Sequence, residues 1–134
     1  MLKIKDSIVP EISDESCVIV ALLHDLGKIG MPGSPQYLKS EGEYPYSFNA
    51  DLVYLSAPIR SICLALPYNE LSEEEVQAIV YHDGQYIDDN AFVARNEEPL
   101  TLLLQYTDNW SGLVPGNEVA IKNLSAFYKI ISLF

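Results

Sequence analysis

Apolar residues recur at helical spacing along most of the chain, and polar or helix-breaking residues separate the apolar stretches. The stretches with this pattern are residues 13–26, 48–66, 72–84, 99–110 and, from about residue 118, the last part of the sequence. Alternation of the kind that indicates a half-buried β-strand is absent at useful length. The pattern therefore predicts an all-α fold, a compact single-domain bundle of about five helices over residues 1–134.

Capping residues mark where several of these helices begin. Ser13 or Asp14 can cap the first helix, and Ser72 begins a capping box at the start of the third. Pro99 suits the first position of the next helix, which is apolar almost all round. Pro58 falls inside the second stretch, where we expect it to kink the helix or to divide it in two.

Two stretches lack a helical pattern. Residues 1–12 are predicted to form an extended N-terminal arm, because Val9 precedes a proline and is disfavoured in helical geometry. Residues 30–47 are rich in Pro and Gly and are predicted to form a long loop in which neither helix nor sheet persists. Long loops in small domains commonly carry function, but we expect the tyrosines of this loop to pin it to the body of the protein.

The charge of the chain narrows the classes of partner. Its 134 residues include 8 basic and 19 acidic residues, for a net charge of −11. A negative net charge disfavours direct binding to nucleic acids and to anionic membranes, although a bound metal ion would allow a phosphate-containing substrate.

No apolar run has the length and position of a signal peptide or of a membrane span. Both cysteines have apolar neighbours, so we expect them to be buried free thiols. We therefore expect a soluble cytoplasmic protein.

One stretch carries the strongest candidate chemistry. The apolar helix that begins near residue 13 ends in His24-Asp25, and Gly27 and Gly30 should then break the helix. An imidazole and a carboxylate together suit a divalent metal ion. Adjacent residues of a regular helix point in different directions. A shared ion would therefore lie beside the helix end, and other elements would complete its ligand set.

Three motifs together resemble the HD superfamily of metal-dependent phosphohydrolases. They are LLHDLGK at Leu22–Lys28, YHDG at Tyr81–Gly84 and LLLQYTD at Leu102–Asp108, in the family's order within the span Glu11–Gly112. The resemblance implies a helical fold around one or two metal ions. It also implies the hydrolysis of phosphate esters, often those of nucleotides.

The resemblance also implies roles for individual residues. The implied ligands of one divalent ion (Mn, Fe, Zn or Mg) are His24, Asp25, Asp108 and, nearby, His82. The ion would lower the pKa of a bound water molecule and polarise the phosphoryl group. Lys28 would contact the phosphate of a small substrate. Asp25 and Lys28 thus belong to the catalytic set, together with Asp83, which would handle a proton.

The chain departs from the family pattern at two positions. Family members normally carry a further metal-ligand histidine before the His-Asp pair, whereas residues 1–23 contain no histidine. Many relatives carry another histidine where this chain has residues 46–49, which also lack one. We therefore expect one metal ion at most, in an incomplete site. A second copy of the chain would complete it only if an apolar surface exists for a homo-oligomer to cover.

These departures favour an alternative function. The chain would then be a catalytically inactive relative that serves as a binding or interaction module for a protein partner, and a trimmed form of this kind suits a phage or mobile element. In that case His24 and Asp25 form a hydrogen-bonded pair, His82 interacts with a helix dipole, and Lys28 is a solvated lysine. The residues alone leave both functions open.

Overall fold

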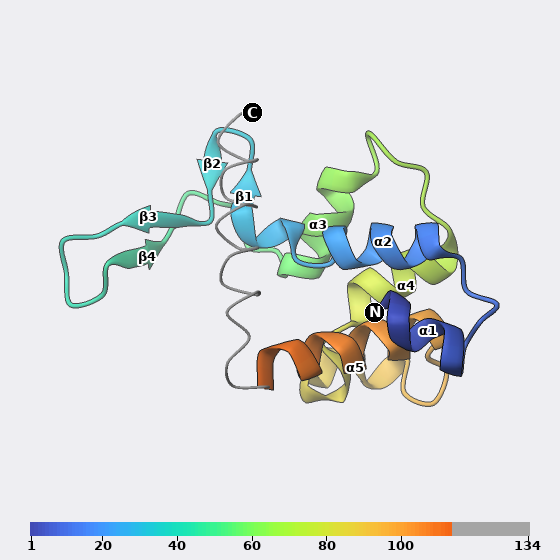
Figure 1. Cartoon of the computed structure of the whole chain (residues 1–134). Helices are drawn as coiled ribbons and strands as arrows, with labels where there is room; N and C mark the ends of the chain where they lie inside the picture. Colours follow the sequence, from blue (N-terminus) through green and yellow to red (C-terminus); the bar gives the residue numbers. More distant parts are fainter. Residues whose placement is uncertain (114–134) are drawn as a thin grey trace.

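The computed structural model describes residues 1–113, so the helix predicted from about Glu118 lies outside the described residues. The α-helices are α1 (Leu2–Ile8), α2 (Asp14–Leu23), α3 (Ala57–Ala65), α4 (Glu73–Tyr81) and α5 (Pro99–Leu113). Short 3-10 turns are η1 (Leu26–Ile29), η2 (Gly84–Tyr86) and η3 (Asp88–Phe92). Helices α2, α4 and α5 pack against one another, and a two-stranded arm extends from the opposite side of the molecule (Figure 1).

The prediction of an all-α fold is wrong. Strands β1 (Gly30–Met31) and β2 (Ser34–Pro35) form one antiparallel hairpin, and β3 (Tyr37–Lys39) and β4 (Tyr46–Phe48) form a second. The described chain is therefore a mixed α and β structure, and residues 30–47 are not an irregular loop. The first hairpin turns through Gly33, whose φ of 74° is a conformation that glycine adopts without steric cost. Strands of two or three residues are too short for alternation to reveal them.

The N-terminal segment is a helix and not the predicted extended arm. Val9 does leave helical geometry, with a φ of −141°, but the seven residues before it form α1. Isolated helices of this length are marginal, so tertiary contacts decide whether they form. The buried Lys5 supplies such a contact, because its ammonium lies 2.8 Å from Asp6 Oδ1 and 2.9 Å from Asp14 Oδ1 at the start of α2.

Most helices begin at the predicted capping residues. Ser13 caps α2, the capping box at Ser72 precedes α4, and Pro99 is the first residue of α5. The prediction for Pro58 is wrong, because this residue neither kinks nor divides a helix. It lies in the first turn of α3, where its missing N–H group needs no partner within the helix.

The hydrophobic core lies between α2, α4 and α5. Its buried residues are Cys17, Val20, Ala78, Ile79, Leu100, Leu103 and Leu104. Each fully buried Val, Leu or Ile side chain contributes about 1.5–3 kcal/mol by leaving water. The core thus fixes the three helices that position the predicted ligands, which lie on α5 or directly after α2 and α4.

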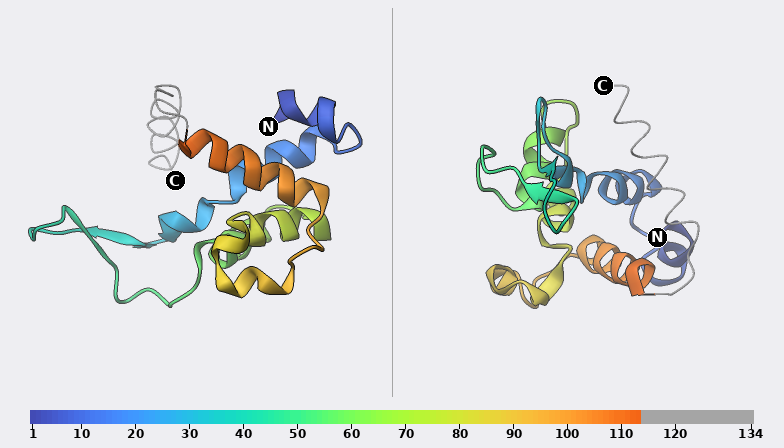
Figure 2. Two further views of the ribbon diagram at one scale, coloured as in Figure 1. Left: turned by 90° about the horizontal axis from the view of Figure 1, so that it is seen from below. Right: turned by 90° about the vertical axis from the view of Figure 1, so that its left-hand side faces the viewer.

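The hairpin β3–β4 forms an arm that projects away from the helices (Figures 1 and 2). All of its strand residues are exposed, and Tyr44 at its tip is 71% exposed. Tyr37 pairs with Phe48 across the strands and Lys39 pairs with Tyr46. The expectation that the tyrosines pin this segment to the body is therefore wrong, because strand pairing holds the segment in place.

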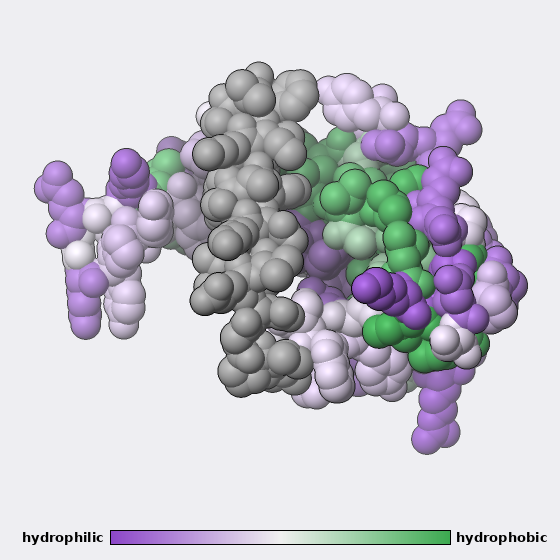
Figure 3. Space-filling view, viewed as in Figure 1, coloured by the Kyte–Doolittle hydropathy of each residue, from purple (hydrophilic) through white to green (hydrophobic). Residues whose placement is uncertain are grey.

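An apolar groove of about 650 Å³ runs along α1 and α2. Its lining includes Leu2, Ile4, Val18 and Leu22, each of them at least 41% exposed. Figure 3 shows the apolar surface that gathers over these helices. A surface of the kind that a homo-oligomer would cover is thus present. Among the described helices, none combines the length and the apolar character that crossing a bilayer requires.

Candidate metal centre

Side chains from three helices meet at one place in the fold. His24 follows α2, His82 follows α4 and Asp108 lies on α5. One potential ligand atom from each residue lies within 4.8 Å of the others. His24 Nε2 is 3.6 Å from Asp108 Oδ1, and the centroids of the two imidazole rings are 4.7 Å apart. Three of the predicted metal ligands are thus brought together.

Asp25 adds a second carboxylate to this cluster. Its Oδ1 lies 3.6 Å from His82 Nε2, and its Oδ2 lies 3.7 Å from His24 Nε2. His24 and Asp25 do not diverge as they would on a regular helix, because α2 ends at Leu23 and Asp25 leaves the helical region, with φ −104° and ψ 5°. The turn η1 follows, and from it the side chain of Lys28 reaches back to Asp25.

Both histidines are oriented by the last turn of the helix that each one follows. Nδ1 of His24 donates to the carbonyl oxygen of Ala21 at 3.0 Å, and Nδ1 of His82 donates to that of Ile79 at 2.9 Å. A carbonyl oxygen can only accept, so each ring carries a proton on Nδ1. When the rings are neutral, each Nε2 therefore directs a lone pair at the carboxylates, as in metal-ligating histidines.

The carboxylate of Asp25 is buried in part and ionised. Its Oδ1 has no hydrogen-bond partner within residues 1–113, because His82 Nε2 at 3.6 Å is too distant. Burial raises the pKa of Asp25, but the imidazole of His82 and the ammonium of Lys28 outweigh burial and hold this pKa well below its usual range. His24 likewise lowers the pKa of Asp108. For His82, burial lowers the pKa, but the carboxylates of Asp25 and Asp83 and the carbonyl oxygen of Ile79 together raise it by more.

This donor set fits a divalent metal ion. Two imidazole nitrogens with two carboxylates form the kind of mixed set that binds Mn, Fe or Zn. Ligand atoms around an ion with bonds of about 2.0–2.1 Å lie about 3.0–3.4 Å apart. Three pairs in the cluster are 3.6–3.7 Å apart, and the ligand atoms of His24, His82 and Asp108 lie within 4.8 Å of one another, so a bound ion would draw the side chains closer together. A cation would also satisfy Asp25 Oδ1, which is costly to bury without a partner.

Lys28 and Asp83 border the cluster. Lys28 Nζ lies 2.6 Å from Asp25 Oδ2, and its side chain is more than half exposed. Asp83 Oδ1 lies 3.5 Å from His82 Nε2 on a side chain that is nearly half exposed. All six residues singled out in the sequence therefore belong to one cluster, while their roles in metal binding and catalysis stay predictions.

Two residues behind the cluster were missed in the sequence. Ser61 and Arg60 of α3 are 0% and 1% exposed, and both hydrogen-bond to the backbone between His24 and Gly27. The sequence does contain a signal, since a serine and an arginine lie inside an apolar helical stretch. Polar groups that are buried need hydrogen-bond partners, so these two residues indicate buried hydrogen bonds. The sequence does not show that those partners belong to the His-Asp turn.

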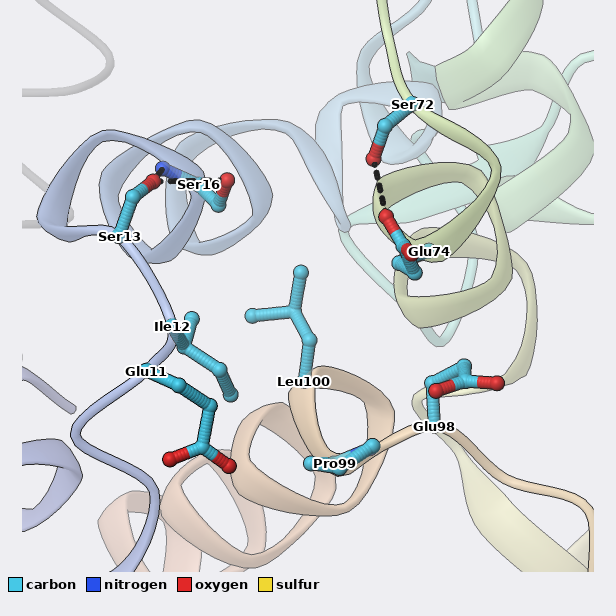
Figure 4. Close-up of a pocket in the computed structure, with 9 residues that line it drawn as sticks. All are labelled: Glu11, Ile12, Ser13, Ser16, Ser72, Glu74, Glu98, Pro99 and Leu100. Atoms are coloured by element: carbon cyan, nitrogen blue, oxygen red, sulfur yellow. Dashed lines mark hydrogen bonds between the residues drawn. The ribbon is translucent and has the colours of Figure 1, made fainter.

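A separate cavity of about 320 Å³ lies where α2, α4 and α5 begin (Figure 4). Its lining contains none of the six cluster residues. Ser13 Oγ bonds to Ser16 within its own helix start, and Ser72 Oγ bonds to Glu74. The hydroxyl groups around this cavity thus serve as local caps, and the candidate chemistry belongs to the cluster at the other ends of α2 and α4.

Comparisons with protein-family models, with curated proteins and with solved structures found no match to this chain. The geometry of the cluster is therefore the basis on which a function can be proposed.

Proposed function

We propose that this chain binds one divalent metal ion between α2, α4 and α5 and acts as an HD-domain-like phosphohydrolase on a nucleotide or another small phosphate ester. The observation that carries the proposal is the convergence of His24 and His82, each oriented through Nδ1, with the ionised carboxylates of Asp25 and Asp108. The ligand set is incomplete by the standard of that family, so we expect low activity.

The residues of the cluster support distinct roles. His24, His82, Asp25 and Asp108 would hold the ion. A bound ion of this kind lowers the pKa of a coordinated water molecule and polarises a phosphoryl oxygen. The exposed ammonium of Lys28 is suited to a phosphate oxygen, although it must first leave Asp25 Oδ2, 2.6 Å away. Asp83, at the open edge of the cluster, is placed to accept or donate a proton.

Metal binding is the first test of this proposal. The metal content of the purified chain, and its titration with Mn²⁺, Fe²⁺, Zn²⁺ and Mg²⁺, should give one ion per chain. Asp25→Asn keeps the size of the side chain and removes its charge, and it should abolish or strongly weaken binding. Asp88→Asn, at the start of η3, is a control that should bind as the unmodified chain does. The proposal fails if the unmodified chain binds none of these ions.

Hydrolysis is the second test. Nucleoside mono-, di- and triphosphates and simple phosphate esters should be screened with the ion that binds most tightly. Release of phosphate or nucleoside by the unmodified chain, and its loss in Asp25→Asn, would support the phosphohydrolase function. Metal binding without turnover of any substrate would leave a metal-binding protein and refute the catalytic part of the proposal.

A second candidate function is a non-catalytic interaction module for a protein partner. The observation that favours it is an exposed aromatic cluster at the base of the arm. The ring centroid of Phe48 lies 6.4 Å from that of Tyr37 on the arm and 6.3 Å from that of Tyr54, which follows the arm in the sequence. Exposed apolar groups gathered in this way commonly mark protein-binding surfaces. If the chain binds no metal ion, the interaction module is favoured over the phosphohydrolase.

We further propose a cytoplasmic location and a homo-oligomer that covers the groove of α1 and α2. Cys17 and Cys63 are both free thiols, which suits a reducing compartment, although only Cys17 is buried as expected and Cys63 is exposed. Sedimentation of the unmodified chain beside Leu22→Asp tests the oligomer, because a charge at this exposed groove residue should prevent association. A chain that sediments as a monomer would refute it.

A further inference from the structure

A single buried hydroxyl group holds the turn that carries two of the proposed ligands. Gly27 N–H donates to Ser61 Oγ at 2.7 Å, and the same hydroxyl donates to the carbonyl oxygen of His24 at 2.9 Å. These two bonds bracket Asp25 in the sequence. The backbone from His24 to Gly27 is therefore fixed at both ends by one side chain of α3.

The packing of Gly27 reinforces this anchor. A Cβ atom at this position would overlap the carbonyl oxygen of Ala57 and lie 2.8 Å from the backbone nitrogen of Ser61. The backbone of the turn thus rests directly on the backbone of α3. Ser61 is fully buried, so water cannot replace the two hydrogen bonds of its hydroxyl group, and the groups left behind would bear the full cost of burial without partners.

Arg60 supports the same turn from behind. Its Nη1 donates to the carbonyl oxygen of Gly27 at 3.3 Å and to Gln36 Oε1 at 2.6 Å, and its Nη2 donates to the carbonyl oxygen of Val53 at 2.9 Å. The guanidinium is 1% exposed, and it forms no salt bridge with a carboxylate of the described residues. The position of the guanidinium is therefore fixed by neutral oxygen atoms, those of Gly27, Gln36 and Val53.

We propose that Ser61, supported by Arg60, is the positioning residue of the metal centre. Its hydroxyl sets the place of His24 and Asp25 relative to His82 and Asp108, which stand on other helices. This inference rests on the proposed function. Ser61→Ala removes both anchoring bonds, and we expect the affinity for Mn²⁺ to fall about 10–100-fold, as when partners behind metal ligands are lost.

A matched control separates positioning from general stability. Thr101 is also 0% exposed, and its hydroxyl donates to Gln77 Oε1 at 2.8 Å, between α5 and α4. Thr101→Val therefore removes a buried hydroxyl group that has no contact with the turn. Mn²⁺ affinity by calorimetry, the absorption spectrum of bound Co²⁺ and the melting temperature should be measured for both variants. The proposal is supported if Ser61→Ala weakens affinity and alters the spectrum while Thr101→Val, at a similar loss of stability, changes neither. Equal effects in the two variants would overturn it.

A measurement on the metal-free chain keeps this inference separate from the proposed function. Ser61→Ala should speed the hydrogen exchange of the Gly27 amide and shift the ring resonances of His24 in NMR spectra, whereas Thr101→Val should do neither. If the unmodified chain binds no metal, the proposed function fails, and these spectra still show whether Ser61 positions the turn. Unchanged spectra would refute it. Should Ser61→Ala not fold, Ser61→Cys, which puts a weaker donor and acceptor in place of the hydroxyl group, provides the same test.

Discussion

Gly27→Ala is the substitution for which the structure makes the sharpest stability prediction. The new methyl group would overlap the carbonyl oxygen of Ala57 and lie 2.9 Å from its carbonyl carbon, so backbone must move on one side or the other. Overpacking of this kind costs about 1–3 kcal/mol. For a chain of this size, each kcal/mol lowers the melting temperature by roughly 3–6 °C. The turn η1 must move by on the order of 1 Å, and disturbing the groups that hold metal ligands in place typically costs about 10–100-fold in metal affinity.

Thermal and urea unfolding measure the first effect, and Mn²⁺ titration measures the second. Gly112→Ala is the matched control, because a Cβ atom at Gly112 meets nothing within 4 Å and the residue lies in α5. This control should be neutral or stabilising by about 0.4–1 kcal/mol. If Gly27→Ala is as stable as the unmodified chain, the turn does not rest on α3 as described. If it is destabilised but binds Mn²⁺ normally, the position of the turn does not govern the metal centre.

Three further predictions concern the core, the buried arginine and pH. Leu104→Ala should lower the free energy of unfolding in urea by about 2–5 kcal/mol, because Leu104 is 2% exposed in the core, and a loss below 1 kcal/mol would contradict this packing. Arg60→Met should cost about 1–3 kcal/mol in the same assay for each carbonyl group that it leaves buried without a donor, and a variant as stable as the unmodified chain would show that these groups find other partners. Affinity for Mn²⁺ should weaken as pH falls through the raised pKa of His82, because a protonated imidazole cannot bind metal; calorimetry at several pH values would refute this if affinity were constant.

Signals within a few residues predicted the helix starts correctly. Ser13, the capping box at Ser72 and Pro99 each act through bonds or geometry within one helical turn, so the sequence contains the whole cause. The convergence of His24, His82 and Asp108 was predicted from the resemblance and not from local signals. Their meeting depends on the way in which α2, α4 and α5 pack.

The errors have a common cause in tertiary contacts. Helix α1 forms at Leu2–Ile8 because Lys5 pairs with Asp14 on the next helix, a contact that local propensity does not contain. The hairpins of residues 30–48 consist of strands of two or three residues, which are too short to show a period. The role of Ser61 depends on bonds to residues 34 and 37 positions earlier in the chain, and no spacing rule links them.

The distribution of buried polar atoms supports a functional origin for the cluster. Within residues 1–113, the buried side-chain atoms without a hydrogen-bond partner are Asp25 Oδ1 and Arg60 Nε. Other buried polar side chains are satisfied, as when Asn90 Nδ2 donates to the carbonyl oxygen of Gly84 at 2.7 Å. The buried atoms without a hydrogen-bond partner thus belong to Asp25 in the His-Asp turn and to Arg60, which supports that turn.

The charges of the cluster are balanced in part by its own members. Asp25, Asp83 and Asp108 gather around two imidazoles in a chain whose net charge is already −11, and His82 and Lys28 lower the pKa of Asp25 as His24 lowers that of Asp108. Two costs remain, because the carboxylates of Asp25 and Asp108 repel each other and Asp25 Oδ1 is buried without a hydrogen-bond partner. Buried polar atoms without hydrogen-bond partners and closely spaced like charges are typical of sites that serve binding or catalysis. A cation held between these carboxylates would relieve both costs, which is why the metal titration is the experiment that decides among the proposed functions.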